Sequence, residues 1–553
     1  MLARSEIDAL FAPDLPDPAH WEERYPPRQL PDGALVTRLA PSPTGAGHIG
    51  LVYMAMIDID VARRSGGRYL VRIEDTDTAR EVSGAIDQFR RAFVYFGLEP
   101  DEEEGRGDYG PYRQSARSAI YHSYARELLR ENKAYLCFNT PDELAAARAA
   151  QQAAKVPTGY YGTWATWRDA SDADVRAKLA EGAPYVVRFR SPGVEGRRAE
   201  FTDAIRGSLS AEDNYNDVVI LKSAAEADTD RLPTYHFAHA VDDHLMRVNL
   251  VIRGEEWLPS VPMHLQLFAA LGFEPPGYAH TAQLMKQVPG GKSKLSKRKL
   301  SKRKDPEAGV DFYISAGYPA KAVLYYLRGL ANGSLAELPL EAALAAPIEL
   351  GELGGAGPLI DQVKLEDISA DHIATLSDLQ VLDAMRTWAA EYDPDLAAVL
   401  DANRDLALAA LAVERHGVPN PRKDLRKWSD FRGAYGFFFA ELFSLVNRTD
   451  PQLGDLPDDL VAAFARDFAD GYLESRDPDE WFGQIRDLAA KHGFAASAKE
   501  YKREPERYPG SIREASQIIR IALTGSTRSP NLASVAQVLG RDEVLRRVTA
   551  LTR

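Results

Sequence analysis

The sequence contains a single cysteine, Cys137, among 553 residues. One thiol excludes an internal disulfide framework and any zinc site built from Cys-x-x-Cys pairs. The chain also lacks any run of 18 or more apolar residues, and its start, MLARSEIDALFAPDLPDP, is too acidic and too interrupted by proline for a signal peptide. We therefore expect a soluble, cytoplasmic protein with no membrane partner.

Acidic side chains outnumber basic ones overall, but basic charge is concentrated in two places. The formal net charge is -14, which argues against indiscriminate nucleic-acid binding. Residues 286–304 nevertheless hold nine basic side chains and no acidic one, and residues 501–553 hold ten basic against five acidic side chains. An acidic body with two separate basic regions suits a polyanion that is bound at chosen points, although many such runs are only solvated faces.

A chain of 553 residues exceeds what one hydrophobic core usually organises, so we expect three or more domains. Residues 34–39 (ALVTRL) predict a short buried strand, followed by a Gly/Pro loop and a helix over 48–64. A second strand (RYLVRIED) and an amphipathic helix over 83–97 come next. This alternation predicts a parallel, doubly wound sheet, with residues 38–48 and 74–77 at the ligand-binding carboxyl ends of its strands.

The sequence pattern that indicates secondary structure changes twice after residue 132. Residues 133–224 contain short β-like runs (PYVVRFR, DVVILK), after which LPTYHFAHAVDDHLM and VNLVIRGEEW return to the earlier style. We interpret the middle segment as an insertion that splits the nucleotide-binding fold. Beyond Asp305 the pattern is mostly helical. The fold class expected is therefore multidomain α/β plus all-α.

The loop PSPTGAGHIGL (residues 41–51) has the composition of a phosphate site. Two prolines fix the chain, glycines permit close approach, and His48 and Gly50 open a helix whose N-terminus carries a partial positive charge. His48 could donate to a phosphate, and Gly50 would let a flat base lie against the backbone. Taken alone, the motif fits a helix-capping histidine better.

The lysine-rich segment PGGKSKLSKRKLSKRK strengthens the phosphate interpretation, because a mobile cationic arm can follow a moving pyrophosphate. Its alternative is a nonspecific basic tract. A Walker A loop is excluded, since Lys286 stands where its first glycine would be. The pentapeptide KLSKR occurs twice in tandem, at 294–298 and 299–303, and this is the only internal repeat.

These motifs resemble the HIGH and KMSKS signatures of class I aminoacyl-tRNA synthetases. TRLAPSPTG, VRIEDTD, YRQSARSAIYHSYARELL, LPTYHFAHAVDDHLM, VIRGEEW and LSKRKDPEAGVDFYISAGYP are similar to bacterial glutamyl-tRNA synthetases, in the order of that family. The resemblance implies an N-terminal extension (1–33) without a recognised counterpart, a Rossmann-like catalytic domain in two halves (34–132 and 225–298), an inserted acceptor-binding domain (133–224), a signature loop with a stem-contact domain (299–377) and a helical anticodon-binding domain (378–553).

The resemblance also implies the reaction, its substrates and the oligomeric state. The substrates are L-glutamate, ATP with Mg²⁺ and tRNA-Glu, and the enzyme is expected to be a monomer. The α-carboxylate of glutamate attacks the α-phosphorus of ATP, pyrophosphate leaves, and the ribose 2′-hydroxyl of the tRNA then takes the glutamyl group. Catalysis of this kind is positioning plus stabilisation of phosphoryl charge. The predicted catalytic residues are His48 and one signature lysine, Lys297 or Lys302, with Lys302 favoured because the following KDPEAGV matches the family better.

Glutamate has two carboxylates and one ammonium, so its pocket needs guanidinium groups and a carboxylate. The family positions predict glutamate binding by Arg38, Ser42, Glu74, Tyr235 and Arg253. ATP binding is predicted for Pro41, Thr44, Gly45, His48, Gly50, Lys297 and Lys302.

Several alternatives remain open. His236, His239, Asp242, Asp243 and His244 could suggest a metal site, but the resemblance assigns this stretch to the substrate pocket. No zinc is expected, because the sequence CFN at 137–139 keeps one thiol. The rival functions are a glutaminyl-tRNA synthetase, an enzyme that also charges tRNA-Gln with glutamate, and a nonenzymatic tRNA-binding relative.

Overall fold

The computed structural model describes residues 2–45, 47–77, 80–223, 231–295, 305–416 and 418–553. The chain divides into two compact units, and each is treated by itself below. Unit 1 comprises residues 1–312 and 324–361, and unit 2 comprises residues 313–323 and 362–553. Within the described ranges, no helix combines the length and the apolar character needed to cross a membrane.

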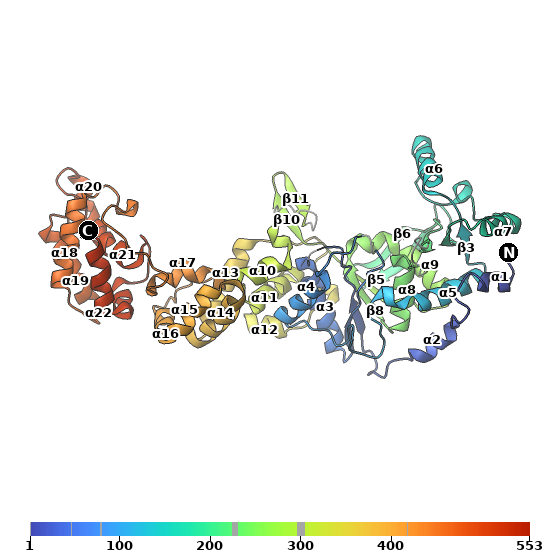
Figure 1. Cartoon of the computed structure of the whole chain (residues 1–553), viewed down its shortest axis with the longest axis horizontal. Helices are drawn as coiled ribbons and strands as arrows, with labels where there is room; N and C mark the ends of the chain where they lie inside the picture. Colours follow the sequence, from blue (N-terminus) through green and yellow to red (C-terminus); the bar gives the residue numbers. More distant parts are fainter. Residues whose placement is uncertain (1, 46, 78–79, 224–230, 296–304, 417) are drawn as a thin grey trace. The chain divides into compact units, whose positions relative to one another are not determined.

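The predicted strand–helix–strand order at the start of unit 1 is confirmed (Figure 1). Strand β1 (Val36–Leu39) pairs in parallel with β2 (Arg68–Val71), and α3 (Ile49–Arg64) connects them. Strand β2 ends earlier than RYLVRIED suggested. The N–H groups of Arg72 and Glu74 still donate to the Leu39 and Pro41 carbonyls, but Pro41 has no N–H to return a bond, and Ile73 N–H donates to the Tyr112 carbonyl. The amphipathic helix is α4 (Ala85–Phe96).

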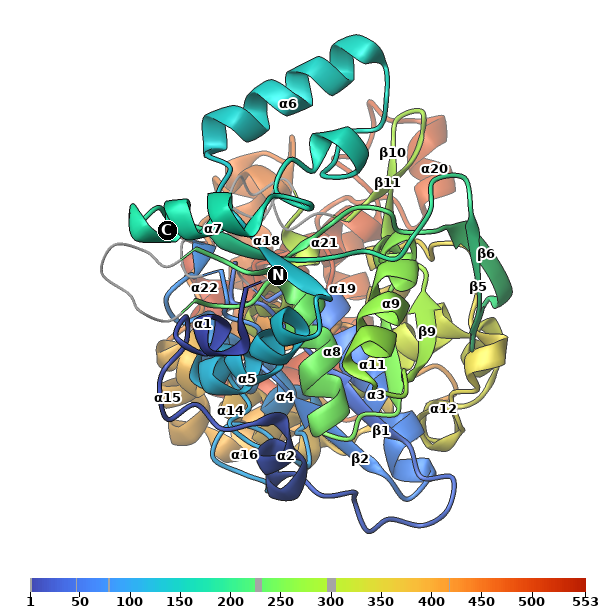
Figure 2. The ribbon, with the colours of Figure 1, turned by 90° about the vertical axis from the view of Figure 1, so that its right-hand side faces the viewer.

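A second sheet has the strand order β6-β5-β9-β8, and Figure 2 labels β6, β5 and β9. Its strands are β5 (Arg198–Asp203), β6 (Gly207–Glu212), β8 (Leu250–Gly254) and β9 (Gly277–Thr281). Strand β9 pairs in parallel with both β8 and β5, whereas β5 and β6 form an antiparallel hairpin. The hairpin lies in the inserted segment by sequence, yet it extends the sheet of the second catalytic half, which also contains α8 (Tyr235–Leu245) and α9 (Val261–Leu271).

The inserted segment is less purely β than its sequence suggested. The runs PYVVRFR and DVVILK form β4 (Val186–Phe189) and β7 (Val219–Leu221), and β3 (Ala134–Cys137) completes their three-stranded sheet. Two helices were not predicted, α6 (Pro141–Ala154) and α7 (Asp172–Ala180). Both begin at capping side chains, since Thr140 accepts from the Glu143 N–H and Ser171 from the Asp174 N–H.

The N-terminal segment packs against unit 1 through α1 (Arg4–Asp8) and α2 (Pro18–Arg24), both of which contact α5 (Ser118–Arg130). Arg130 of α5 bonds Asp8 at 2.5 Å, and Arg126 bonds Asp17 at 2.7 Å. The Trp21 indole N–H donates to Ser123 Oγ at 2.9 Å. The first 25 residues are therefore part of the folded unit.

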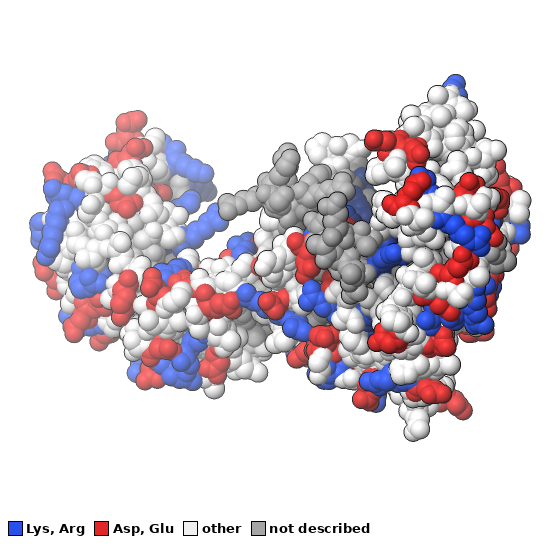
Figure 3. Space-filling view, turned by 45° about the vertical axis from the view of Figure 1, so that its right-hand side comes forward, with Lys and Arg blue, Asp and Glu red and all other residues white. Residues whose placement is uncertain are grey.

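The lysine-rich segment begins as a hairpin of β10 (Met285–Val288) and β11 (Gly291–Lys294), visible in Figure 1. Lys286 pairs with Asp305, so one of the nine clustered basic side chains already has an acidic partner. Both predicted signature lysines, Lys297 and Lys302, lie outside the described residues. On the face drawn in Figure 3, acidic side chains lie among basic ones over most of the described surface.

The predicted helical character after Asp305 is confirmed, since the described residues beyond it form no strand. Unit 2 has one extended apolar core that includes Phe464, Trp481 and Ile518. The described α-helices after Asp305 are α10 (Val310–Ala316), α11 (Ala320–Ala331), α12 (Leu340–Ala345), α13 (Gln362–Thr375), α14 (Asp378–Tyr392), α15 (Pro394–Ala402), α16 (Arg404–Ala412), α17 (Phe431–Tyr435), α18 (Asp458–Gly471), α19 (Pro478–Lys491), α20 (Ala498–Arg503), α21 (Ile512–Thr524) and α22 (Leu532–Ala550), which is kinked at Gly540. Of these, α12 belongs to unit 1 and α13 to α22 belong to unit 2.

Candidate active site

A cavity of about 610 Å³ opens at the carboxyl ends of β1 and β8. All five residues predicted for glutamate binding line it, together with Thr44. The arginine, lysine and carboxylic acid side chains on its wall are four basic and two acidic groups: Arg38, Arg80, Lys222, Arg253, Glu74 and Asp77. A cavity with this balance favours an anionic ligand that also carries one positive group.

Not every predicted residue lines this cavity. Pro41, Gly45, His48 and Gly50 do not, although they belong to the same loop and helix start. Lys297 and Lys302 remain outside the described residues. The predicted glutamate residues and Thr44 are thus brought together, whereas the other described residues predicted for ATP binding are not among those that line the cavity.

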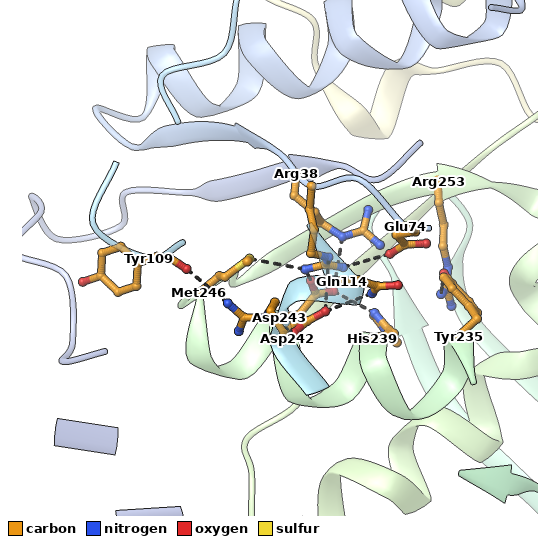
Figure 4. Close-up of polar contacts among 12 residues, drawn as sticks. Arg38, Glu74, Tyr109, Gln114, Tyr235, His239, Asp242, Asp243, Met246 and Arg253 are labelled. Carbon is orange, nitrogen blue, oxygen red and sulfur yellow. Dashed lines mark hydrogen bonds and ion pairs between the residues drawn. The ribbon is translucent and has the colours of Figure 1, made fainter. Parts of the chain in front are cut away.

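The floor of the cavity is a network of buried charges (Figure 4). Arg38 Nε donates to Asp243 Oδ2 at 3.2 Å, and its Nη1 donates to the Ile252 carbonyl at 3.3 Å. Arg72, which is fully buried, donates to Asp243 Oδ1 at 2.5 Å and to Glu74 Oε1 at 3.1 Å. Asp243 therefore fixes two arginines, and Arg72 fixes Glu74.

These contacts set the protonation of the two carboxyl groups in different directions. Burial alone would raise the pKa of Asp243, but Arg72 and Arg38 hold it well below its usual range. Burial raises the pKa of Glu74 to about 7, even though Arg72 and Arg38 oppose the shift. Glu74 is therefore a carboxyl group whose charge is sensitive to a cation placed beside it.

The two neighbouring aspartates on α8, Asp242 and Asp243, bond to arginines and to polar side chains. Asp242 accepts hydrogen bonds from Arg117 Nε at 2.7 Å, Tyr121 Oη at 2.8 Å and Gln114 Nε2 at 2.9 Å. His239 Nδ1 lies 2.7 Å from Asp243 Oδ2, and burial lowers the pKa of His239 to about 3. Across the described ranges, no group of three His, Cys, Asp or Glu side chains could hold a metal ion.

Arg253 stands opposite this floor with three side-chain partners. Its Nε donates to His280 Nε2 at 3.0 Å, its Nη2 to His264 Nδ1 at 3.2 Å, and its Nη1 to the Tyr235 hydroxyl at 3.3 Å. Figure 4 shows Arg253 and Tyr235 beside Glu74. Tyr235 is the first residue of α8, and Arg253 lies near the end of β8.

His48 is the N-cap of α3, as its position in the motif indicated. Its Nδ1 accepts from the Gly50 N–H at 2.9 Å, so a neutral ring carries its proton on Nε2. A Cβ on Gly50 would lie 2.9 Å from His48 Nδ1, so the close approach that requires glycine here is to the His48 ring. The same loop contacts the chain after the lysine-rich segment, because Val310 N–H donates to the Gly47 carbonyl at 2.9 Å.

Sequence reasoning missed Arg72, Asp203, His264, His280 and Lys222. Arg72 had a signal, because it stands among apolar residues in the buried run YLVRI. Lys222 lines the cavity, donates to the Thr76 carbonyl at 2.6 Å, and has its pKa lowered by burial. The two histidines and Asp203 had no local signal, since their partners are distant in sequence.

Comparison with known proteins identifies two parts of the chain. Residues 34–338 match the family described as tRNA synthetases class I (E and Q), catalytic domain. Residues 511–552 match the family described as anticodon binding domain. The first match contains the cavity and its charged floor.

The curated relatives align with nearly the whole chain. A glutamate--tRNA ligase of Clostridium beijerinckii is 40% identical in an alignment of 542 positions that covers 96% of this chain and 95% of that protein. One of Acetivibrio thermocellus is 38% identical in an alignment of 557 positions that covers 98% of each chain. A crystal structure of the glutamate-tRNA synthetase from Elizabethkingia anophelis superposes with a TM-score of 0.72 at 27% identity, covering 94% of this chain and 99% of that one.

The Acetivibrio alignment leaves about 2% of this chain unmatched, roughly 11 residues, so it reaches into residues 1–33, for which the sequence motifs showed no recognised counterpart.

A catalytic-domain match over more than half the chain, and relatives of one activity over nearly its full length, agree with the glutamate prediction rather than with the glutaminyl or nonenzymatic alternatives. The chain belongs to the glutamate--tRNA ligases, a family of class I aminoacyl-tRNA synthetases.

Proposed function

We propose that the cavity binds L-glutamate, with Arg38 and Arg253 on its two carboxylates and Glu74 on its ammonium group. The observation that carries this assignment is the charge arrangement, with two arginines of different strands on the wall and the Glu74 carboxyl between them. Charge-assisted bonds to a guanidinium are the strong contacts for a carboxylate. Ser42 and Tyr235 complete the predicted glutamate contacts.

The ATP side of the reaction is assigned to the loop at residues 41–50 and to the lysine-rich arm. Pro41, Thr44, Gly45 and Gly50 would lie along the nucleotide, and the helix N-terminus at His48 favours phosphate. Magnesium arrives with the ATP phosphates as part of that substrate. When the glutamate α-carboxylate attacks the α-phosphorus, His48 and one signature lysine would stabilise the charge on the phosphoryl oxygens. Between Lys302 and Lys297, we favour Lys302.

The remaining segments are proposed to bind tRNA. The insertion (133–224) would take the acceptor end, residues 299–377 the stem, and residues 378–553 the anticodon, the last supported by the family match at 511–552. Unit 2 also has a cavity of about 530 Å³ whose lining includes Arg422, Arg426 and Arg528. Arginine guanidinium groups bind phosphates and stack on bases, which suits single-stranded RNA.

One experiment tests the glutamate assignment directly. In ATP–pyrophosphate exchange with tRNA present, Glu74→Gln should raise KM for glutamate by about tenfold or more, because a charge-assisted bond is worth roughly 1.5–3 kcal/mol. The KM for ATP should stay within about twofold. An unchanged KM for glutamate in Glu74→Gln would refute the assignment of the ammonium site.

The choice of tRNA is the second question. An enzyme that also charges tRNA-Gln with glutamate remains the alternative, and monomeric behaviour is the family default. Charging purified tRNA-Glu and tRNA-Gln side by side separates the two activities. Comparable kcat/KM values for the two would establish the broader specificity.

A further inference from the structure

Arg253 has an unusual set of partners for a ligand-binding arginine. A guanidinium has five N–H donors and no acceptor, so every partner of Arg253 must accept. Three donors are committed, to His280 Nε2, His264 Nδ1 and the Tyr235 hydroxyl. That leaves one N–H on each Nη, the pair that a carboxylate can take end-on. The three contacts hold the guanidinium plane while two donors remain for the ligand.

The contact with His280 fixes the state of that ring. Because His280 Nε2 accepts from Arg253, the ring proton lies on Nδ1, which faces Asp203 Oδ2 at 2.6 Å. Burial lowers the pKa of His280, although Asp203 opposes the shift. Burial would raise the pKa of Asp203, but the hydrogen bonds from His280 and from the backbone N–H groups of Ile205 and Arg206 lower it. The pair is therefore an ionised carboxylate beside a neutral imidazole.

A pair of histidines, His264 and His236, lies on the other side of the guanidinium, and His264 contacts it. His264 Nδ1 accepts from Arg253 Nη2, so its Nε2 carries the proton and donates to His236 Nδ1 at 3.0 Å. Burial lowers the pKa of His236 to about 4 and holds that of His264 well below its usual range. Both rings are therefore held neutral, and their lone pairs form a chain: His264 Nδ1 accepts from Arg253, and His236 Nδ1 accepts from His264.

Asp203 does not belong to the catalytic halves of the sequence. It is the last residue of β5, in the inserted segment, and it pairs with Tyr278 of β9. Its Oδ1 also accepts from the Ile205 and Arg206 N–H groups at 3.0 Å, and Arg206 Nε donates back to the His280 carbonyl at 3.0 Å. Asp203 is 1% exposed and His280 is fully buried. The Asp203 carboxylate is therefore held in place by bonds other than its contact with the His280 ring.

We propose that Asp203 and His280 are positioning residues for glutamate binding: Asp203 fixes the His280 tautomer, and His280 fixes Arg253 for a substrate carboxylate. This inference rests on the proposed role of Arg253 and adds a residue of the inserted segment to the determinants of glutamate affinity. Neither residue touches the ligand. Their effect passes through the orientation of one guanidinium, because a donor held in place loses less freedom on binding.

Two substitutions at His280 separate this role from simple packing. His280→Gln can place its amide oxygen near the position of Nε2 and still accept from Arg253. His280→Asn can place its amide nitrogen near the position of Nδ1 and still donate to Asp203, but it leaves Arg253 without that acceptor. In ATP–pyrophosphate exchange with tRNA present, His280→Asn should raise KM for glutamate about tenfold, the scale of one lost bond to a charged group. His280→Gln should stay within about threefold, and KM for ATP should be unchanged in both.

Asp203→Asn tests the tautomer step. A neutral amide no longer requires the proton on His280 Nδ1, so the ring can turn a donor towards Arg253, and KM for glutamate should rise about threefold to tenfold. The matched control is Asp217→Asn. Asp217 is an equally buried carboxylate of the insertion that bonds Tyr135, Ser191 and Arg168 and does not contact His280. It should leave KM for glutamate within about twofold.

The outcomes distinguish the inference from the function on which it rests. If Arg253→Ala leaves KM for glutamate unchanged, the assignment of the pocket fails. If Arg253→Ala raises it while His280→Asn and Asp203→Asn do not, only the positioning inference fails. Equal effects of His280→Asn and His280→Gln would overturn it as well, because a packing role does not distinguish the two ends of the ring.

Discussion

Buried charge is used differently in the two units. In unit 1, the buried cations Arg38 and Arg72 bond carboxylates. In the described part of unit 2, Arg415 and Arg547 are the buried charged side chains, and their carboxylate partners, Asp378 and Glu543, are partly exposed, whereas Asp243 and Glu74 in unit 1 are buried. Both unit 2 arginines also bond carbonyls at helix ends: Arg415 those of Ile373 and Leu376, Arg547 those of Phe437 and Leu523. Most of the remaining interior of that unit is apolar.

The difference shows where stability and where function reside. Burying a charge costs free energy unless it is paired, so a cluster of buried charges beside a cavity indicates a site selected for a ligand. An arginine that donates to carbonyls at a helix end satisfies acceptors that have no hydrogen-bond partner within the helix. We therefore expect core substitutions in unit 2 to act on stability and pocket substitutions in unit 1 to act on substrate affinity.

The largest effect should come from the core of unit 2. Trp481 is 1% exposed and packs edge-on against Phe468 at 6.2 Å between ring centroids. Trp481→Ala should lower the free energy of unfolding of this unit by about 3–5 kcal/mol, because it leaves a large cavity. Urea unfolding followed by circular dichroism measures this loss, while KM for glutamate of the folded enzyme should be unchanged.

A surface residue of the same unit provides the control. Leu473 is 68% exposed, and Leu473→Ala should change the unfolding free energy by less than about 0.5 kcal/mol. A large change of KM for glutamate in Trp481→Ala would contradict the division between the two units.

The next effect concerns Arg253. Arg253→Ala should reduce kcat/KM for glutamate by an amount equivalent to about 2–5 kcal/mol, because a substrate carboxylate loses its charge-assisted bonds. The KM for ATP should stay within a few-fold. Steady-state ATP–pyrophosphate exchange measures both.

Arg90→Ala is the matched surface control, since Arg90 is a half-exposed arginine of the same unit that lies 3.6 Å from Glu103. An exposed pair of this kind contributes little, so its substitution should leave glutamate kinetics unchanged. Equal losses in both variants would mean that the Arg253 effect is not local to the pocket.

The duplicated signature provides the third test. Lys302→Ala should lower the activation rate by roughly two orders of magnitude, whereas Lys297→Ala should cost far less, because only a lysine beside the phosphates stabilises the transition state. Pre-steady-state formation of glutamyl-adenylate measures the step. The reverse order would assign the role to Lys297. Equal, mild losses would mean that the copies substitute for one another, and deletion of residues 299–303 should then preserve activity.

How much the sequence could predict depended on the range of the interactions. Local sequence patterns were enough to predict strand β1, helix α3 and the residues at their junction, because periodicity and capping involve residues only a few positions apart. Helix α6 also had a local signal that was missed, since TPDE at 140–143 is a capping box with proline at the first position.

The supports of the site could not be predicted in this way. His280 meets Asp203, 77 positions away, only because β9 pairs with β5 of the insertion. Asp243 meets Arg38 across 205 positions. Such contacts depend on strand order and on which helix covers which sheet, and neither is specified by residues that are neighbours in sequence. The motifs therefore located the side chains on the cavity wall but not the residues behind them.

The smallest effect is a pH dependence that belongs to Glu74. Burial raises its pKa to about 7 in the empty pocket, so the carboxyl becomes neutral as the pH falls through that value. A substrate ammonium requires the ionised form, and KM for glutamate should therefore rise as the pH is lowered from 8 to 6, approaching about tenfold per unit below the pKa. The neighbouring groups do not titrate in this window, because the pKa of His239 is lowered to about 3 and that of Asp243 lies well below its usual range. Measuring KM for glutamate and for ATP at half-unit steps tests this, with Glu74→Gln as the control that should show a higher but pH-independent KM for glutamate. A wild-type KM for glutamate that stays flat between pH 6 and 8 would show that Glu74 is already ionised in the free enzyme, and that Arg72 and Arg38 outweigh its burial.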